Sequence, residues 1–309
     1  MRSLKEALLN RSKNIDVVGM AIDAAKAYIN ANYEIEGKLT FENINGTCIV
    51  NCDGVVVIKN KKIVKLTDGF VWGKVKKDFY CSYCDRLISL EGAPEKVKGV
   101  FYCQYCENLK SLEGAPKEVG KDFYCTGCTK LESLEGAPEK VDGFYCIECI
   151  NIKTLEGAPK NVDGNFNCYG CTKLESLEGA PKEVGGFFIC TECVNLKTLK
   201  GAPKKVGTNF LCTNCIELNT LEDAPKEVGG NFYCIGCNNL KTLKGAPEKV
   251  GGEFRCEHCK NLISLKGAPE TVGELFSCYN CENLKSLEGV PKKAKKIVCD
   301  GRLKINKKL

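Results

Sequence analysis

Residue types on which catalysis and membrane insertion depend are scarce in this sequence. Its 309 residues include one histidine, one tryptophan and two methionines. With His258 as the single histidine, no Ser/His/Asp set can be assembled, and neither a phosphate-binding glycine loop nor a spaced carboxylate pair is present. No apolar run approaches the roughly 20 residues that span a bilayer. We therefore expect no enzyme, no catalytic residues, no cofactor and no membrane segment.

A secretory signal is also missing. The first 20 residues, MRSLKEALLNRSKNIDVVGM, have charges scattered through them and no continuous apolar stretch. We therefore expect a cytoplasmic protein. Cytoplasmic thiols stay reduced, so the 23 cysteines do not by themselves indicate a disulfide framework.

Net charge is concentrated at the C-terminal end. The segment 291–309 holds eight Lys or Arg and one Asp, which accounts for the formal charge of +6, while the rest of the chain is close to neutral. A basic tail, 292–308, offers at most a weak site for nucleic acid. The alternative is a solvated end whose lysines keep the edge of the fold from pairing with another chain.

Internal repetition is the dominant feature of the chain. A C-x-x-C pair recurs every 22 residues, except for one step of 21 residues between Cys125 and Cys146. All ten prolines occupy one position of the same unit. The consensus is F-x-C-x-x-C-x-x-L-x-[ST]-L-[EK]-G-A-P-x-x-V-G-x-x. The pairs begin at Cys81, Cys103, Cys125, Cys146, Cys168, Cys190, Cys212, Cys234, Cys256 and Cys278.

Each unit is too short to form its own core. Proline fixes φ and lacks an N–H donor, so the G-A-P segment predicts a turn, and x-F-x-C-x predicts a short strand. One unit cannot bury its Phe, Cys, Leu and Val side chains alone, whereas stacked units bury one continuous core. The fold class predicted is a β-rich solenoid with parallel strands, one per 22-residue coil.

The repeat resembles that of leucine-rich-repeat proteins, whose units follow L-x-x-L-x-L-x-x-[NC]-x-L. Phe232 and Cys234 match the inward strand positions of that pattern, Cys237 matches the Asn/Cys position, and Leu240 and Leu243 follow in the loop. The L-x-S-L-E-G-A-P units are also similar to arrays in bacteriophage and bacterial genomes. The resemblance covers about residues 75–300, and it implies a binding scaffold that uses its concave sheet face.

The two ends of the chain differ from the repeat. Residues 1–74 predict an α+β N-terminal cap, with helix over 1–30, a capping box at Ser3 and Glu6, and strands over 38–75. The stretch VVVIKNKKIVKL predicts a β-hairpin, and Trp72 is expected to pack the cap onto the first coil. The solenoid itself is expected over 75–298, and 299–309 form a basic C-terminal end.

The repeated C-x-x-C pairs admit three interpretations. They could bind structural zinc, with two pairs supplying four thiolates to one ion; they could form disulfides; or they could be reduced core residues, because buried cysteine behaves as a small hydrophobe. The residues between the two cysteines vary and the first cysteine alternates with an inward Phe, so we favour reduced core columns and assign no metal site.

If Phe and Cys point inward, the residues between and beside them point outward. Those positions are rich in tyrosine, which is typical of binding surfaces. The alternative is that neighbouring tyrosines only stabilise the sheet. Stacking of single-stranded nucleic acid would need basic residues, and Arg255 is the one basic residue in these columns. The predicted partner-binding residues are Tyr80, Tyr102, Tyr124, Tyr145, Tyr169, Tyr233 and Arg255.

These observations predict a non-enzymatic scaffold that binds a protein partner, with no small-molecule substrate. The alternatives are a zinc-binding or redox-responsive structural protein, and a component of a phage or surface assembly.

Overall fold

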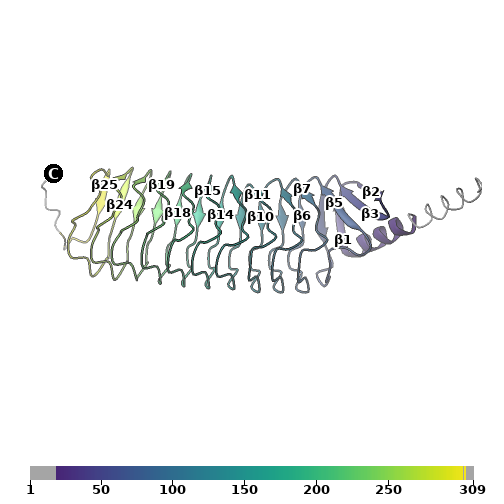
Figure 1. Cartoon of the computed structure of the whole chain (residues 1–309), viewed down its shortest axis with the longest axis horizontal. Coiled ribbons are helices and arrows are strands. Elements are labelled where there is room, and N and C mark those ends of the chain that lie inside the picture. The colour runs from purple at the N-terminus through teal and green to yellow at the C-terminus, as the bar shows by residue number, and fades with distance from the viewer. Residues whose placement is uncertain (1–18, 302, 304–309) are drawn as a thin grey trace, which may run out of the picture.

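The computed structural model describes residues 19–301 and 303, and these form a β-solenoid of stacked coils. Figure 1 shows an extended rod with a helix at the N-terminal end and the coils stacked along its length. The fold class predicted from the repeat is therefore confirmed. The predicted capping box at Ser3 and Glu6 lies outside the described residues, as does most of the basic end 299–309.

One sheet runs along the whole described length of the rod, and we call it the phenylalanine sheet. Its first pair is antiparallel and all later pairs are parallel, with each phenylalanine opposite that of the next coil. Its 13 strands, in spatial order, are β1 (Tyr33–Glu36), β4 (Val55–Ile58), β6 (Phe79–Tyr80), β8 (Phe101–Tyr102), β10 (Phe123–Tyr124), β12 (Phe144–Tyr145), β14 (Phe166–Asn167), β16 (Phe188–Ile189), β18 (Phe210–Leu211), β20 (Phe232–Tyr233), β22 (Phe254–Arg255), β24 (Leu275–Ser277) and β25 (Lys296–Val298).

Each coil also contributes a second short strand, which the sequence did not predict. The x-x-V residues after the proline pair with their counterparts in neighbouring coils, with Val inward. Five strands form one such sheet: β2 (Leu39–Ile44), β3 (Thr47–Cys52), β5 (Val71–Val75), β7 (Lys96–Val97) and β9 (Glu118–Val119). Seven form another: β11 (Lys140–Val141), β13 (Asn161–Val162), β15 (Glu183–Val184), β17 (Lys205–Val206), β19 (Glu227–Val228), β21 (Lys249–Val250) and β23 (Thr271–Val272). Each coil is thus closed by two strands and two turn-rich sides.

The N-terminal segment is built onto the first coil. A helix includes residues 19–32 and buries Ala25 and Ile29. Trp72 is fully buried, and its ring contacts that of Phe79 in the first repeat with centroids 6.1 Å apart, as expected of a residue that joins cap to coil. The parallel pairing β4–β6 and β5–β7 continues across the predicted boundary at residue 74, so the cap strands act as a preceding coil.

The hairpin predicted for VVVIKNKKIVKL is wrong. Only Val55–Ile58 form a strand there, and its two edges are taken by β1 and β6, so none remains for a hairpin partner. Ile63 and Leu66 are buried from a loop instead of from a second strand. Their side chains enter the core in the same way as the leucines of each later coil.

The core consists of columns of identical side chains. Ten phenylalanines, one per coil, are fully buried, and their rings stack with centroids 5.1–5.6 Å apart. Two leucine columns and the valine column complete the interior. Because each inner ring of the column lies between two others, truncating it would open a cavity against both neighbouring coils.

The C-x-x-C-x-x-L spacing follows from two successive turns. In the coil of Cys190, the Cys193 amide donates to the Cys190 carbonyl at 3.4 Å, and the Leu196 amide donates to the Cys193 carbonyl at 2.9 Å. Both cysteines and the leucine therefore point into the core from one corner. The spacing that suggests a zinc knuckle in the sequence is here the spacing of a tight corner.

A second corner explains the glycine before Ala-Pro. In Leu199–Ala202 the Ala202 amide donates to the Leu199 carbonyl at 2.8 Å, and Gly201 has φ +87°, as in a type II turn. A Cβ at Gly201 would lie 2.5 Å from the Leu177 carbonyl oxygen of the preceding coil. Glycine is required there both for its backbone conformation and for the close approach of two coils.

Polar side chains on the turn-rich sides pair across coils in alternation. Lys197 forms an ion pair with Glu175 at 3.0 Å, and the Lys173 ammonium donates to the Asn151 amide oxygen at 2.6 Å. These residues flank the first leucine (or isoleucine) that follows each C-x-x-C pair. In five successive coils the residues before and after it are Asn108 and Lys110, Lys130 and Glu132, Asn151 and Lys153, Lys173 and Glu175, and Asn195 and Lys197. Each residue therefore faces an unlike residue in the next coil.

Candidate functional site

The cysteines lie in the core of the coils. All are free thiols, and all except the half-buried Cys299 are buried. The thiol of the second cysteine in a coil donates to the carbonyl of the first cysteine in the preceding coil, as from Cys193 to Cys168 at 3.2 Å. Within residues 19–301 and 303, no three His, Cys, Asp or Glu side chains are grouped so that they could hold a metal ion. The placement of the cysteines as core columns is confirmed.

His258 lies where the sequence suggested, on the surface. It follows Cys256 in the corner turn, is exposed, and its Nδ1 lies 2.9 Å from the Asn280 amide nitrogen of the next coil. Its neighbours Cys256 and Cys259 are turned into the core.

Four of the predicted residues form one continuous stack on the outer side of the phenylalanine sheet. Tyr80, Tyr102, Tyr124 and Tyr145 belong to β6, β8, β10 and β12, and successive ring centroids lie 4.4, 5.1 and 4.4 Å apart. All four side chains are half-buried. The ring faces inside the stack are covered by one another, so ring edges and hydroxyl groups face outward. A nucleic-acid base therefore finds no free face between these rings.

Two further tyrosines extend this surface, and the sequence did not single them out. Tyr83 and Tyr105 occupy the corner turns of the first two C-x-x-C pairs, and their rings stack with centroids 5.0 Å apart. Tyr83 is 57% exposed and Tyr105 37%. We call the outward side of β6, β8, β10 and β12 together with Tyr83 and Tyr105 the tyrosine face.

The backbone at these two positions is unusual for tyrosine. Tyr83 has φ 62° and Tyr105 has φ 54°, in the left-handed region. A left-handed conformation costs a non-glycine residue roughly 1–2 kcal/mol. The equivalent position is left-handed in all ten C-x-x-C corners. Five coils place glycine or asparagine there, namely Gly127, Gly170, Asn214, Gly236 and Asn280, and three place Glu148, Glu192 and His258. A φ value cannot be read from a varied x-x pair, which is why the sequence alone does not reveal these tyrosines.

Between the two rows of rings lie small polar residues. Ser82 and Thr126 follow inward cysteines and so point outward, yet they are only 8% and 7% exposed. Neither hydroxyl has a hydrogen-bond partner among the residues that the structure describes. An unpaired buried hydroxyl costs free energy, so this part of the surface is not optimised for the isolated chain.

The carboxylates of the tyrosine face interact with its phenols. The Tyr80 hydroxyl donates to Asp78 Oδ2 at 3.4 Å, and the Tyr124 hydroxyl donates to Asp122 Oδ2 at 3.3 Å. Partial burial, with these carboxylates and the neighbouring phenols, raises the pKa of Tyr80 to about 12 and also raises that of Tyr124. Both phenols therefore stay neutral at physiological pH, with lone pairs available to a donor from solution.

Tyr233 and Arg255 lie further along the same sheet and form a separate cluster. The Arg255 guanidinium carbon lies 5.5 Å from the Tyr233 ring centroid, and its Nε donates to Glu253 Oε2 at 2.7 Å. The Tyr233 hydroxyl donates to the same carboxylate oxygen at 2.7 Å. Tyr169 stands apart from both groups, in the corner after Cys168, where the charge of Glu192 raises its pKa.

A groove lies over the valine-containing strands, at the single 21-residue step of the repeat. Coil four has one residue fewer between Val141 and Phe144, and the second sheet is interrupted between β9 and β11. In eight coils the backbone amide of the residue after the valine donates to the valine carbonyl of the preceding coil. In the short coil, the Asp142 amide donates to the Lys121 carbonyl instead. A groove of about 990 Å³ lies at this interruption.

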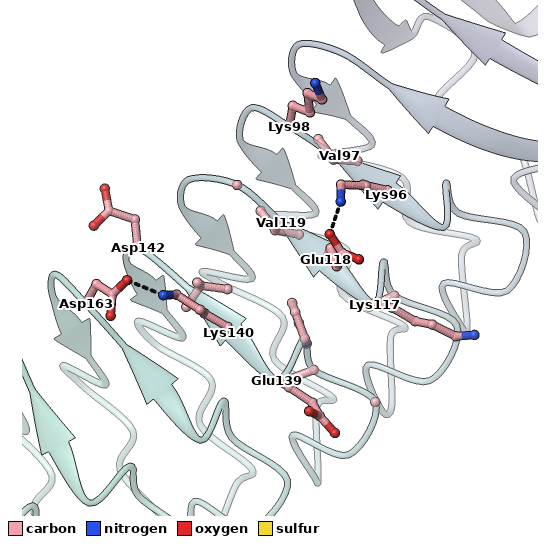
Figure 2. Close-up of a pocket in the computed structure, with 16 residues that line it drawn as sticks. Lys96, Val97, Lys98, Lys117, Glu118, Val119, Glu139, Lys140, Asp142 and Asp163 are labelled. Carbon is pink, nitrogen blue, oxygen red and sulfur yellow. Dashed lines mark hydrogen bonds and ion pairs between the residues drawn. The ribbon is translucent and has the colours of Figure 1, made fainter.

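Charged side chains around that groove pair with one another. Figure 2 shows Lys96 directed at Glu118 on one side of the interruption and Lys140 directed at Asp163 on the other, at 2.8 Å in the second pair. Small and aliphatic residues such as Ala115 also line the groove, and a similar groove of about 920 Å³ lies over the next coils. Because Lys96, Glu118, Lys140 and Asp163 already pair with one another, we rank this groove below the tyrosine face as a candidate for a specific site.

Comparison with known proteins gives no relative to this chain: no family model, no curated protein and no solved structure matches it. Within the described part of the chain, no helix is both long enough and apolar enough to cross a bilayer.

Proposed function

We propose that the protein is a non-enzymatic recognition scaffold that binds a protein partner on the tyrosine face. The observation that carries this proposal is the exposure of Tyr83 and Tyr105 in left-handed backbone positions. Because every corner shares this backbone conformation, the conformation itself belongs to the fold; the two tyrosines place large exposed side chains there at a conformational cost that glycine or asparagine would reduce. Tyrosine supplies a large contact area at low cost in side-chain entropy.

The competing explanation is that the tyrosines stabilise the sheet. For Tyr102 and Tyr124 this explanation is strong, because cross-strand aromatic pairs contribute roughly 0.2–1 kcal/mol each. For Tyr83 and Tyr105 it is weaker, because their stacking competes with the conformational cost of the backbone. These two residues therefore separate a binding role from a structural one.

The test replaces both corner tyrosines with glycine, the residue found there in the coils of Gly127 and Gly170. A random-peptide library displayed on phage is selected against the full chain, and the enriched peptides are measured against the variant Tyr83→Gly/Tyr105→Gly. Binding should be lost, while the free energy of unfolding stays equal or rises. The matched control is Ile216→Ser, an exposed side chain 41% accessible in a distant coil, which should leave binding unchanged.

Two results would contradict the proposal. One is that every selected peptide binds the glycine variant as well as the original chain. The other is that the glycine variant unfolds more than about 1 kcal/mol more easily, since the tyrosines would then have a mainly structural role.

A further inference from the structure

We infer that the partner docks a cationic side chain, arginine or lysine, onto the carboxylates Asp78 and Asp122 of the tyrosine face. This inference rests on the proposed function and specifies the chemistry of the partner. It is drawn from a comparison of two parts of the same sheet, one of which already contains a guanidinium.

The chain itself shows how the sheet holds a cation. In β22, Arg255 stands two residues after Glu253 and directly opposite Tyr233 of β20. Its guanidinium lies against the Tyr233 ring, and Glu253 accepts hydrogen bonds from both the arginine and the phenol. Glu257 adds a second carboxylate 3.8 Å from the guanidinium. Ring, phenol and carboxylate together bind the positive charge by cation–π and charge-assisted contacts.

The same arrangement recurs in the first coils with tyrosine in place of the arginine. In β10, Tyr124 stands two residues after Asp122 and directly opposite Tyr102 of β8. Asp78 and Tyr80 have the same relation in the first coil. Here the carboxylates receive only phenol and backbone donors: among residues 19–301 and 303, no Lys or Arg side chain forms an ion pair with Asp78 or Asp122.

Charge complementarity identifies the missing group. In the three outward columns of β6 to β12, the ionised side chains are Asp78 and Asp122, and none of those positions is basic. Lys61 lies at the end of this surface, with its ammonium on the Ser82 carbonyl at 3.0 Å. The remaining groups are phenol oxygens and the unpartnered hydroxyls of Ser82 and Thr126, which can accept hydrogen bonds from a guanidinium or ammonium. An anionic partner would meet two uncompensated carboxylates instead.

Substituting asparagine for Asp78 and Asp122 tests the role of their negative charge without removing a side chain that the fold uses. Asp78 Oδ1 accepts the Val100 amide of the next coil at 2.8 Å, and Asn165 and Asn209 make the same bond at the same position in later coils. In Asp78→Asn the amide oxygen can keep the bond from the Val100 amide. The amide nitrogen takes the place of the oxygen that accepts the phenol, and it can donate to that phenol instead, as Asn231 does to Tyr233 at 3.1 Å. Asp78→Asn/Asp122→Asn therefore removes the negative charge and keeps a hydrogen-bonding side chain of the same shape. The matched control is Glu113→Gln/Glu135→Gln, which removes two exposed carboxylates from the loop row on another side of the coil.

The experiment measures fluorescence anisotropy of a labelled synthetic peptide of alternating glycine and arginine, titrated with the full-length chain at physiological salt. We expect saturable binding that weakens about tenfold or more in Asp78→Asn/Asp122→Asn, since each charge-assisted hydrogen bond lost accounts for roughly a tenfold factor. The loop-row control should bind as the original chain does. Arg255→Ser should add binding, because it vacates the cluster of Tyr233 and Glu253.

Several results would overturn the inference: no binding of the arginine peptide, equal binding by the asparagine variant, equal weakening by the loop-row control, or equally tight binding of a glycine–glutamate peptide. Failure of the proposed function gives a different result. If library peptides without Arg or Lys bind and require Tyr83 and Tyr105, the cation inference fails and the recognition surface stands. If no peptide requires those tyrosines, the recognition surface itself fails.

Discussion

Raising the pH from about 7.5 to about 9.5 should remove most of the stability of this fold, because it ionises cysteine in the unfolded chain but not in the folded one. For eight thiols of the core, burial raises the pKa well above the ordinary value near 8.5. Their contribution to folding is therefore complete below about pH 8.5 and declines as the pH rises further. Eight thiols whose pKa is raised chiefly by burial are those of Cys81, Cys103, Cys125, Cys168, Cys171, Cys215, Cys234 and Cys259.

The size of this loss of stability can be worked out from the ionisation of cysteine in the unfolded chain alone. At one pH unit above its pKa, ionisation stabilises an unfolded cysteine by about 1.4 kcal/mol, whereas at one unit below the effect is under about 0.1 kcal/mol. Eight thiols kept neutral in the core therefore lower the free energy of unfolding by about 11 kcal/mol between the two conditions. Since whole domains are stable by about 5–15 kcal/mol, the coils should unfold or come close to unfolding. Tyrosine adds little below its ordinary pKa near 10.

The assay is urea unfolding followed by circular dichroism at each pH, with a phosphine reductant present so that oxidation does not contribute. Ionised thiol is followed separately by its ultraviolet absorbance. The midpoint should fall steeply with pH, and most of the thiolate absorbance should appear only with unfolding. Cys234→Ala should reduce the pH-dependent loss by about 1.4 kcal/mol, because one such thiol is removed. The half-buried Cys299, replaced in the same way, should change it less.

A midpoint that is the same at both pH values would refute this reasoning. So would ionisation of most of the thiols at pH 9.5 in a chain that remains folded, because the eight buried cysteines would then be accessible to water in the native state.

Three further perturbations test the packing. Phe188→Ala removes a fully buried ring that stacks on two others, and it should lower the free energy of unfolding, measured in urea, by about 3–5 kcal/mol. Ile216→Ala, on an exposed side chain, should lower it by less than about 1 kcal/mol. Equal losses would contradict the placement of Phe188 in the core. Gly201→Ala should cost more than about 1 kcal/mol by the same measurement, because the glycine has φ +87° and faces a carbonyl oxygen; a neutral effect would show that the corner can relax. Inserting one glycine between Asp142 and Gly143 restores the 22-residue step and should join the sheet that ends at β9 to the one that begins at β11. Hydrogen exchange of the backbone amides in β9 and β11 should then slow. Unchanged exchange would show that the interruption has another cause.

The sequence was most informative where identical residues recur. The Pro and Cys columns set the length of the coil, and the two-residue period of a strand is enough to place Phe232 and Cys234 on the same, inward side. The stack of Tyr80 and Tyr102 follows from the same register, because equivalent positions of neighbouring coils lie side by side. The solenoid and one of its surfaces could therefore be predicted from the repeat.

Other features depend on geometry that a repeat does not encode. The second strand of each coil is two residues long, too short for a periodic pattern, so x-x-V could only be interpreted as part of a turn. The importance of Tyr83 depends on a backbone dihedral angle and on its exposure, neither of which follows from its place inside C-x-x-C. The mistaken hairpin has a tertiary cause, because strands from elsewhere in the chain occupy both edges of Val55–Ile58.

The alternating pairs on the turn-rich sides have a consequence for how such a gene can change in length. Losing the single coil that contains Lys173 and Glu175 would bring Lys153 beside Lys197, so that two ammonium groups meet where a lysine now faces a glutamate. Losing two consecutive coils would keep unlike residues adjacent. Within the five coils from Asn108 to Lys197, loss or gain of repeats by recombination should therefore be tolerated best in multiples of two.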